Sequence, residues 1–138
     1  MTDEADGSDL ASFLADLRDE QATIAREVHA TVADVAPELL PPTRRVALLG
    51  YGAFHYRYAS GREGDADLVS LRGGSKHLSV FVSAVDDGWY LPEIHAAALG
   101  AVSVGRSCIR VRRAGDLDLS AFADVVRRAV AVGGEGQV

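Results

Sequence analysis

The sequence contains no asparagine, only one lysine and only one cysteine, while arginine occurs thirteen times. The single cysteine, Cys108, excludes a disulfide bond within the chain, which fits a reducing compartment. The preference for arginine over lysine, together with the missing asparagine, is typical of a compositional bias of the genome. We therefore assign no function to these frequencies.

Two further absences concern membranes and secretion. No apolar run approaches the roughly 20 residues that a membrane-spanning helix needs. The N-terminus, MTDEADGSD, is acidic and lacks the apolar segment of a signal peptide. We therefore expect a cytoplasmic protein that does not associate with membranes.

The charge balance limits the classes of partner. The formal net charge of −6 disfavours non-specific binding to nucleic acid. A local basic face could still bind an anion, because binding depends on the nearby field more than on the net charge.

Length and composition are typical of one packed domain. The chain has 138 residues, of which 48% are hydrophobic and 25% are charged. We expect a single domain over residues 1–138 with an ordered core at about 9–131. The acidic start and the Gly-rich end, GGEGQV, predict that both termini fray.

Apolar residues recur at helical spacing from Leu10 to Val35, which predicts one long helix over 9–35. Ser8 is its expected N-cap, and the prolines from Pro37 onward end it. A break near Arg18 into two helices is the alternative interpretation.

The middle of the chain alternates with the period of β-strands. In FHYRYAS, the residues Phe54, Tyr56 and Tyr58 share one face, while His55 and Arg57 share the other. The segments DLVSLR, KHLSVFVS and SCIRVRR continue an antiparallel meander. The last helix begins after Asp118. The expected core comprises Phe54, Tyr56, Val80, Val82, Ile109, Val111, Phe122 and Val126.

This order of elements predicts an α+β fold. The expected architecture is a two-layer sandwich, in which the N- and C-terminal helices pack on one face of a mostly antiparallel sheet.

Several segments resemble a known family. LLGYGAFHYRYASGREGD, SKHLSVFV, VGRSCIR and DLDLSAFADVVRRAV are similar to the YdhG-like family of small bacterial domains of unknown function, over about residues 35–131. Many relatives carry a proline in the turn after the YG pair, where this chain has Ala53. The resemblance implies a frataxin-like fold, and some members are labelled iron chaperones on that basis. Such an analogy does not fix the function, and the family supplies no catalytic residues to transfer.

The solvent face of the expected sheet holds most candidate ligand-binding residues, because arginine and histidine there could bind an anion or an acidic partner. An ordinary solvated face is the alternative. For Cys108, a buried structural thiol is the favoured interpretation. The candidates are Tyr51, His55, Arg57, Arg72, His77, Cys108, Arg110 and Arg112.

Acidic residues form a row along the expected long helix, and carboxylates in a row suit hard cations, weakly. The frataxin resemblance favours iron as that cation, whereas a solvated helix flank is the alternative, and a broken helix would divide the row. The histidines show no spacing typical of a transition-metal site. The weak metal candidates are Asp9, Asp16, Glu20, Glu27 and Asp34.

These observations favour a non-enzymatic intracellular binding protein for iron, held weakly, or for a small anion. No cofactor is required. The alternative is a protein–protein interaction module, or a homodimerising domain, that uses the open sheet face. Since no nucleophile with an orienting base can be assembled from the motifs, we do not expect an enzyme. The oligomeric state is left open between monomer and homodimer.

Overall fold

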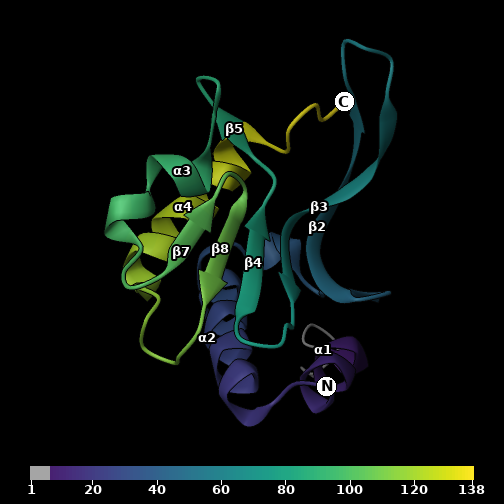
Figure 1. Cartoon of the computed structure of the whole chain (residues 1–138). Coiled ribbons are helices and arrows are strands. Elements are labelled where there is room, and N and C mark those ends of the chain that lie inside the picture. Colours follow the sequence, from purple (N-terminus) through teal and green to yellow (C-terminus); the bar gives the residue numbers. More distant parts are fainter. Residues whose placement is uncertain (1–6) are drawn as a thin grey trace.

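The computed structural model describes residues 7–138 of the chain (Figure 1). Its helices are α1 (Gly7–Ala15), α2 (Asp19–Val35), α3 (Leu91–Ile94) and α4 (Leu119–Val132), with 3-10 turns η2 (Pro37–Leu39) and η3 (Ala96–Ala98). The strands are β1 (Thr43–Arg45), β2 (Leu48–Arg57), β3 (Glu63–Arg72), β4 (Leu78–Val82), β5 (Val85–Asp86), β6 (Trp89–Tyr90), β7 (Ser103–Gly105) and β8 (Cys108–Val111).

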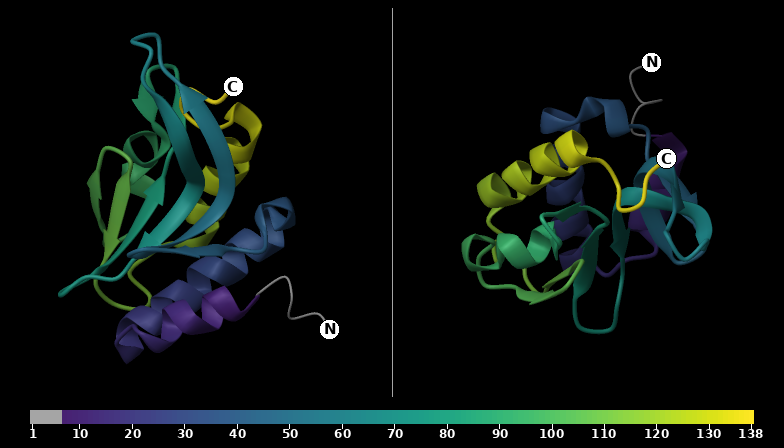
Figure 2. Two further views of the ribbon diagram at one scale, coloured as in Figure 1. Left: turned by 90° about the vertical axis from the view of Figure 1, so that its right-hand side faces the viewer. Right: turned by 90° about the horizontal axis from the view of Figure 1, so that it is seen from above.

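Six strands form one antiparallel sheet in the order β1-β2-β3-β4-β8-β7, and β5 and β6 form a separate hairpin. The α+β class predicted from the sequence is confirmed. The helices α2 and α4 contact each other, and both lie behind the sheet in the view of Figure 1. The two turned views in Figure 2 show the same arrangement, so the opposite face of the sheet is left uncovered by the long helices.

The prediction of one continuous helix over 9–35 is wrong, and the alternative break is what the structure shows. Arg18 has an extended backbone, with φ −67° and ψ 156°, and it separates α1 from α2. Ser8 lies inside α1 and is not its N-cap, because α1 begins at Gly7. The spacing of the apolar residues does not reveal the break, because a short interruption can preserve the helical phase on both sides.

The buried core joins α1, α2 and α4 to the inner side of the sheet. Phe122, Val126 and the expected residues of β4 and β8 belong to it, but Phe54 and Tyr56 do not. Both residues lie in the half of β2 beyond Gly52, where the strand, which is continuous from Leu48 to Arg57, is lined by the C-terminal segment: Phe54 lies beside Gly134, and Tyr56 forms a bridge with Gln137. Before Gly52 the core residue is Tyr51, which is fully buried.

The Gly-rich C-terminus, which was expected to fray, lies along the outer part of β2. The amide of Arg57 donates to the carbonyl of Gly136 over 2.9 Å, and that of Val138 donates to the carbonyl of His55 over 3.1 Å. A Cβ atom at Gly134 would lie 2.3 Å from the ring of Phe54, so glycine is needed for this close approach. The expected fraying of residues 1–6 lies outside the described residues.

Candidate functional site

The open face of the sheet carries two rows of outward side chains. The registers between neighbouring strands give both rows. One row runs Arg72, Ser79, Arg110 and Ser103, from β3 across β4 and β8 to β7. The adjacent row runs Ser70, Phe81, Cys108 and Gly105 across the same strands.

A basic pocket of about 450 Å³ lies at the end of this face formed by β7, β8 and the β3–β4 turn. Its lining contains no carboxylate. Among residues 7–138, no ion pair joins the cations of the pocket to an aspartate or glutamate. Within the part of the chain that the structure describes, the positive charge of the pocket therefore has no acidic side chain in direct contact. The lining residues are Lys76, His77, Ala101, Val102, Ser103, Arg110 and Arg112.

Two small residues of β7 allow Arg110 to lie across the edge of the sheet. A Cβ atom at Gly105 would lie only 2.8 Å from a guanidinium nitrogen of Arg110, so a side chain at this position would shift the end of that arginine. The guanidinium also donates to the hydroxyl of Ser103 over 3.5 Å, a long contact. Arg110 is thus positioned beside the pocket by neutral groups, which leaves its charge available to a ligand.

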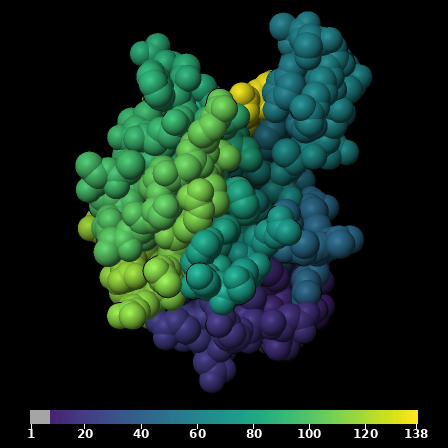
Figure 3. Space-filling view, viewed as in Figure 1, coloured from purple at the N-terminus to yellow at the C-terminus, as the bar shows by residue number. Residues whose placement is uncertain are grey.

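A second cavity, here called the sheet groove, has a volume of about 400 Å³ and lies further along the same face. Its lining combines hydroxyl groups, apolar side chains, two arginines and two aspartates. Figure 3 shows the surface hollowed between the β7–β8 and β2–β3 hairpins, where the groove lies. The lining residues are Arg45, Leu48, Asp65, Ala66, Asp67, Ser70, Arg72, Phe81, Ser83 and Ser107.

The buried carboxylate of the groove is paired. Asp67, only 8% exposed, accepts two hydrogen bonds from the guanidinium of Arg45, at 2.7 and 2.9 Å. The hydrogen bonds to Asp67 and its negative charge raise the pKa of Arg45. The guanidinium in turn balances the charge of the Asp67 carboxylate. The carboxylate fits because Gly50 has no side chain: a Cβ atom there would lie 2.1 Å from a carboxylate oxygen of Asp67.

Gly50→Ala is therefore expected to lower the free energy of unfolding by about 1–3 kcal/mol, because the methyl group displaces Asp67 from its charge-assisted hydrogen bonds. Urea unfolding measures the change. In a double-mutant cycle with Asp67→Ala, the two losses should be less than additive, since both remove the same pairing. Additive losses would contradict this account of Gly50.

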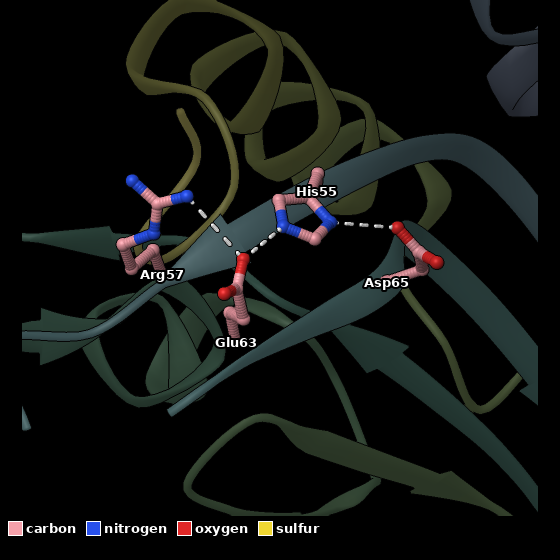
Figure 4. A network of polar contacts seen from close by, with 4 residues as sticks. All are labelled: His55, Arg57, Glu63 and Asp65. Carbon is pink, nitrogen blue, oxygen red and sulfur yellow. Dashed lines mark hydrogen bonds and ion pairs between the residues drawn. The ribbon is translucent and has the colours of Figure 1, made fainter. Parts of the chain in front are cut away.

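At the far end of β2 and β3, His55 lies between two carboxylates (Figure 4). Its Nδ1 is 2.9 Å from Asp65 and its Nε2 is 2.8 Å from Glu63. Both ring nitrogens must donate to satisfy these contacts, which requires the protonated imidazolium. The hydrogen bond to Asp65, and next that to Glu63, raises the pKa of His55. Glu63 also accepts a longer contact of 3.4 Å from Arg57.

This cluster predicts a pH dependence of the β2–β3 hairpin. Because the folded pKa of His55 lies above the ordinary histidine value of 6.5, its stabilising contribution is complete below that pH and is lost as the pH rises through the folded pKa. An NMR titration of the His55 ring should give a pKa above 6.5, and Asp65→Asn should lower it. A pKa at or below 6.5 in the unmodified protein would contradict the contacts.

The eight ligand candidates from the sequence do not form one site. Arg72, His77, Arg110 and Arg112 lie at the basic end of the open face. His55 and Arg57 lie at the tip of the β2–β3 hairpin, within the cluster described above. Cys108 is half-buried on the open face, opposite Phe81.

Tyr51 is not a surface ligand residue, which corrects the expectation for it. It is fully buried, and its hydroxyl lies 2.7 Å from Nδ1 of His29 on α2. The sequence placed Tyr51 before a turn, whereas the backbone continues as a strand through it.

The acidic row is divided by the break between α1 and α2, and part of it has structural partners. Asp9 accepts from the amide of Arg44 over 2.8 Å, and Asp16 pairs with the guanidinium of Arg44 over 2.7 Å. Glu20 accepts from the amide of Ala114 over 2.5 Å. Glu27 and Asp34 line a shallow cavity together with Arg127. Within residues 7–138, no three histidine, cysteine or acidic side chains are grouped as metal ligands would be.

Sequence reasoning missed Lys76, Ser103 and the Arg45–Asp67 pair. A signal for the Arg45–Asp67 pair was present, because Gly50 lies within β2, and Gly105 at the end of β7 gave a similar signal for the position of Arg110. A glycine inside a strand often marks the close approach of another group, and here the approaching groups are Asp67 and Arg110.

Comparisons of the chain with known protein families, curated proteins and solved structures gave no match. The resemblance to the YdhG-like family stays a prediction from the sequence. No helix within residues 7–138 combines the length and the apolar character that crossing a bilayer requires.

Proposed function

We propose that this protein binds a small anionic ligand, carrying a phosphate or carboxylate group, in the basic pocket. The observation that carries the proposal is the composition of that pocket. Lys76, Arg110 and Arg112, together with His77, line a cavity of about 450 Å³ that no carboxylate enters.

The pocket contains complementary donors for an oxyanion. A guanidinium presents a planar fork of donors that matches a carboxylate or phosphate, whereas a lysine ammonium acts as a compact charge. The hydroxyl of Ser103 adds a neutral donor beside Arg110. The negative charge of the rest of the protein disfavours long polyanions, so the pocket suits small ligands.

A binding role fits the pocket better than catalysis. Neither the hydroxyl of Ser103 nor the imidazole of His77 has the orienting partner that nucleophilic or acid–base chemistry needs. Ser103 contacts Arg110, and no carboxylate of residues 7–138 contacts His77.

The iron-binding alternative receives less support from the geometry. Asp9, Asp16 and Glu20 already accept hydrogen bonds from Arg44 and Ala114, which would have to be broken before a cation could bind. The alternative of an interaction module is favoured by one observation, the half-buried Phe81 at the centre of the open face. In that case the occupant is a second copy of the chain.

A calorimetric titration with inorganic phosphate near pH 7 at low ionic strength tests the proposal. We expect saturable binding with a Kd of about 1 mM or below, weakened by added sodium chloride because exposed charges are screened. The absence of saturable binding would contradict the proposal. Concentration-dependent self-association in light scattering, without phosphate binding, would favour the interaction module instead.

A further inference from the structure

The sheet groove lies next to the basic pocket on the same face, and its chemistry differs from that of the pocket. We propose that the groove receives an aromatic ring and that the ligand of this protein is an aromatic anion. This inference rests on the proposed function, because the anionic group of the ligand occupies the basic end of the face.

The groove has a mixed lining suited to a planar ring. Phe81 and Leu48 supply apolar surface, and Ser70 and Ser83 supply hydroxyl groups. Its volume of about 400 Å³ lies within the range of small-molecule sites. An aromatic ring placed against Phe81 gains both from apolar burial and from ring–ring contact.

Both carboxylates in the lining of the groove have partners, so neither repels an anion as an unpaired buried charge would. Asp67 is held by two hydrogen bonds from Arg45, and Asp65 contacts the ring of His55. Arg72 also lines the groove. It belongs to the row of outward residues that continues through Ser79 to Arg110 in the basic pocket. The positive charge on this face therefore increases from the groove toward the basic pocket, in the direction that attracts the anionic group of a ligand.

The spacing of the sheet sets the size of the ligand. Phe81 and Ser79 are two residues apart on β4, about 7 Å at the usual rise of a strand. Arg72 and Arg110 flank Ser79 on the neighbouring strands β3 and β8. Because the long arginine side chains can bridge part of this distance, a ligand whose anionic group is joined to its ring through a single oxygen atom reaches Phe81 and these arginines at once.

The test compares two phosphate monoesters of equal charge, 1-naphthyl phosphate and methyl phosphate, by calorimetry on the full chain. We expect 1-naphthyl phosphate to bind at least about tenfold more tightly, which corresponds to about 1.4 kcal/mol. Phe81→Val should remove this advantage and leave the affinity for methyl phosphate within about twofold. Urea unfolding of the variant checks that the fold is retained, and Phe81→Leu is the second variant if valine is not tolerated.

The outcomes separate this inference from the proposed function. Equal affinities for the two monoesters would overturn the aromatic ligand while leaving anion binding intact. An advantage for 1-naphthyl phosphate that survives both Phe81 variants would also overturn it, because the ring would then bind elsewhere. Failure of both monoesters to bind would contradict the proposed function itself.

Discussion

Replacing Phe122 by alanine is expected to lower the free energy of unfolding by about 3–5 kcal/mol, a large part of the stability of a domain of this size. Phe122 is fully buried on the inner side of α4. It is the fourth residue of that helix, and Leu117 lies just before the N-cap Asp118, the spacing of a hydrophobic staple. The substitution therefore has two effects, since it leaves a cavity in the core and also weakens the start of α4.

Urea unfolding measures this loss, and Val130→Ala on the exposed side of the same helix is the matched control. Val130 is 36% exposed, so its truncation should cost about 1 kcal/mol or less. A loss below about 1 kcal/mol for Phe122→Ala would show that the side chain does not contribute to the core as described.

Replacing Arg110 and Arg112 together by glutamine should weaken phosphate binding at least about tenfold. Hydrogen bonds to charged groups contribute about 1.5–3 kcal/mol each, and the variant removes the charged donors of two side chains. Arg112 is exposed and Arg110 is half-buried without an ion pair among the described residues, so the free energy of unfolding should change by about 0.5 kcal/mol or less.

The matched control removes the same charge from the hairpin tip. The Arg57→Gln, Arg62→Gln pair changes the net charge equally but lies away from the basic pocket. It should alter the Kd for phosphate by less than about twofold. Equal weakening by the two pairs would mean that phosphate responds only to the overall charge of the protein and not to this pocket.

The sequence predicted the parts of the fold that depend on local patterns. The N-cap Asp118 was expected and accepts a hydrogen bond from the amide of Ala121 over 3.0 Å. The alternation in β4 and β8 correctly placed Val80 and Ile109 in the core. Local spacing is sufficient for these features because each depends on residues that are close in the chain.

Features that depend on distant contacts could not be predicted. The partner of Glu20 is the amide of Ala114, 94 positions away in the chain, and the partner of Asp16 is Arg44, 28 positions away. Alternation alone placed Phe54 and Tyr56 in the core, whereas they lie beside Gly134 and Gln137 of the distant C-terminus. The candidate site was predicted only in part. Its arginines followed from the alternation of the strands, whereas Lys76 and Ser103 lie beside them only because the sheet has the strand order β4-β8-β7.

The central claim is that an anion binds at the basic end of the open sheet face. The most direct measurement is an NMR titration with inorganic phosphate, following the backbone amide signals of the whole chain. We expect saturable shifts centred on Lys76, Ser103 and Arg110, with one common Kd, and little change on α1 and α2. Shifts centred on the helices or on the β2–β3 hairpin tip, or no saturable shifts at all, would contradict it.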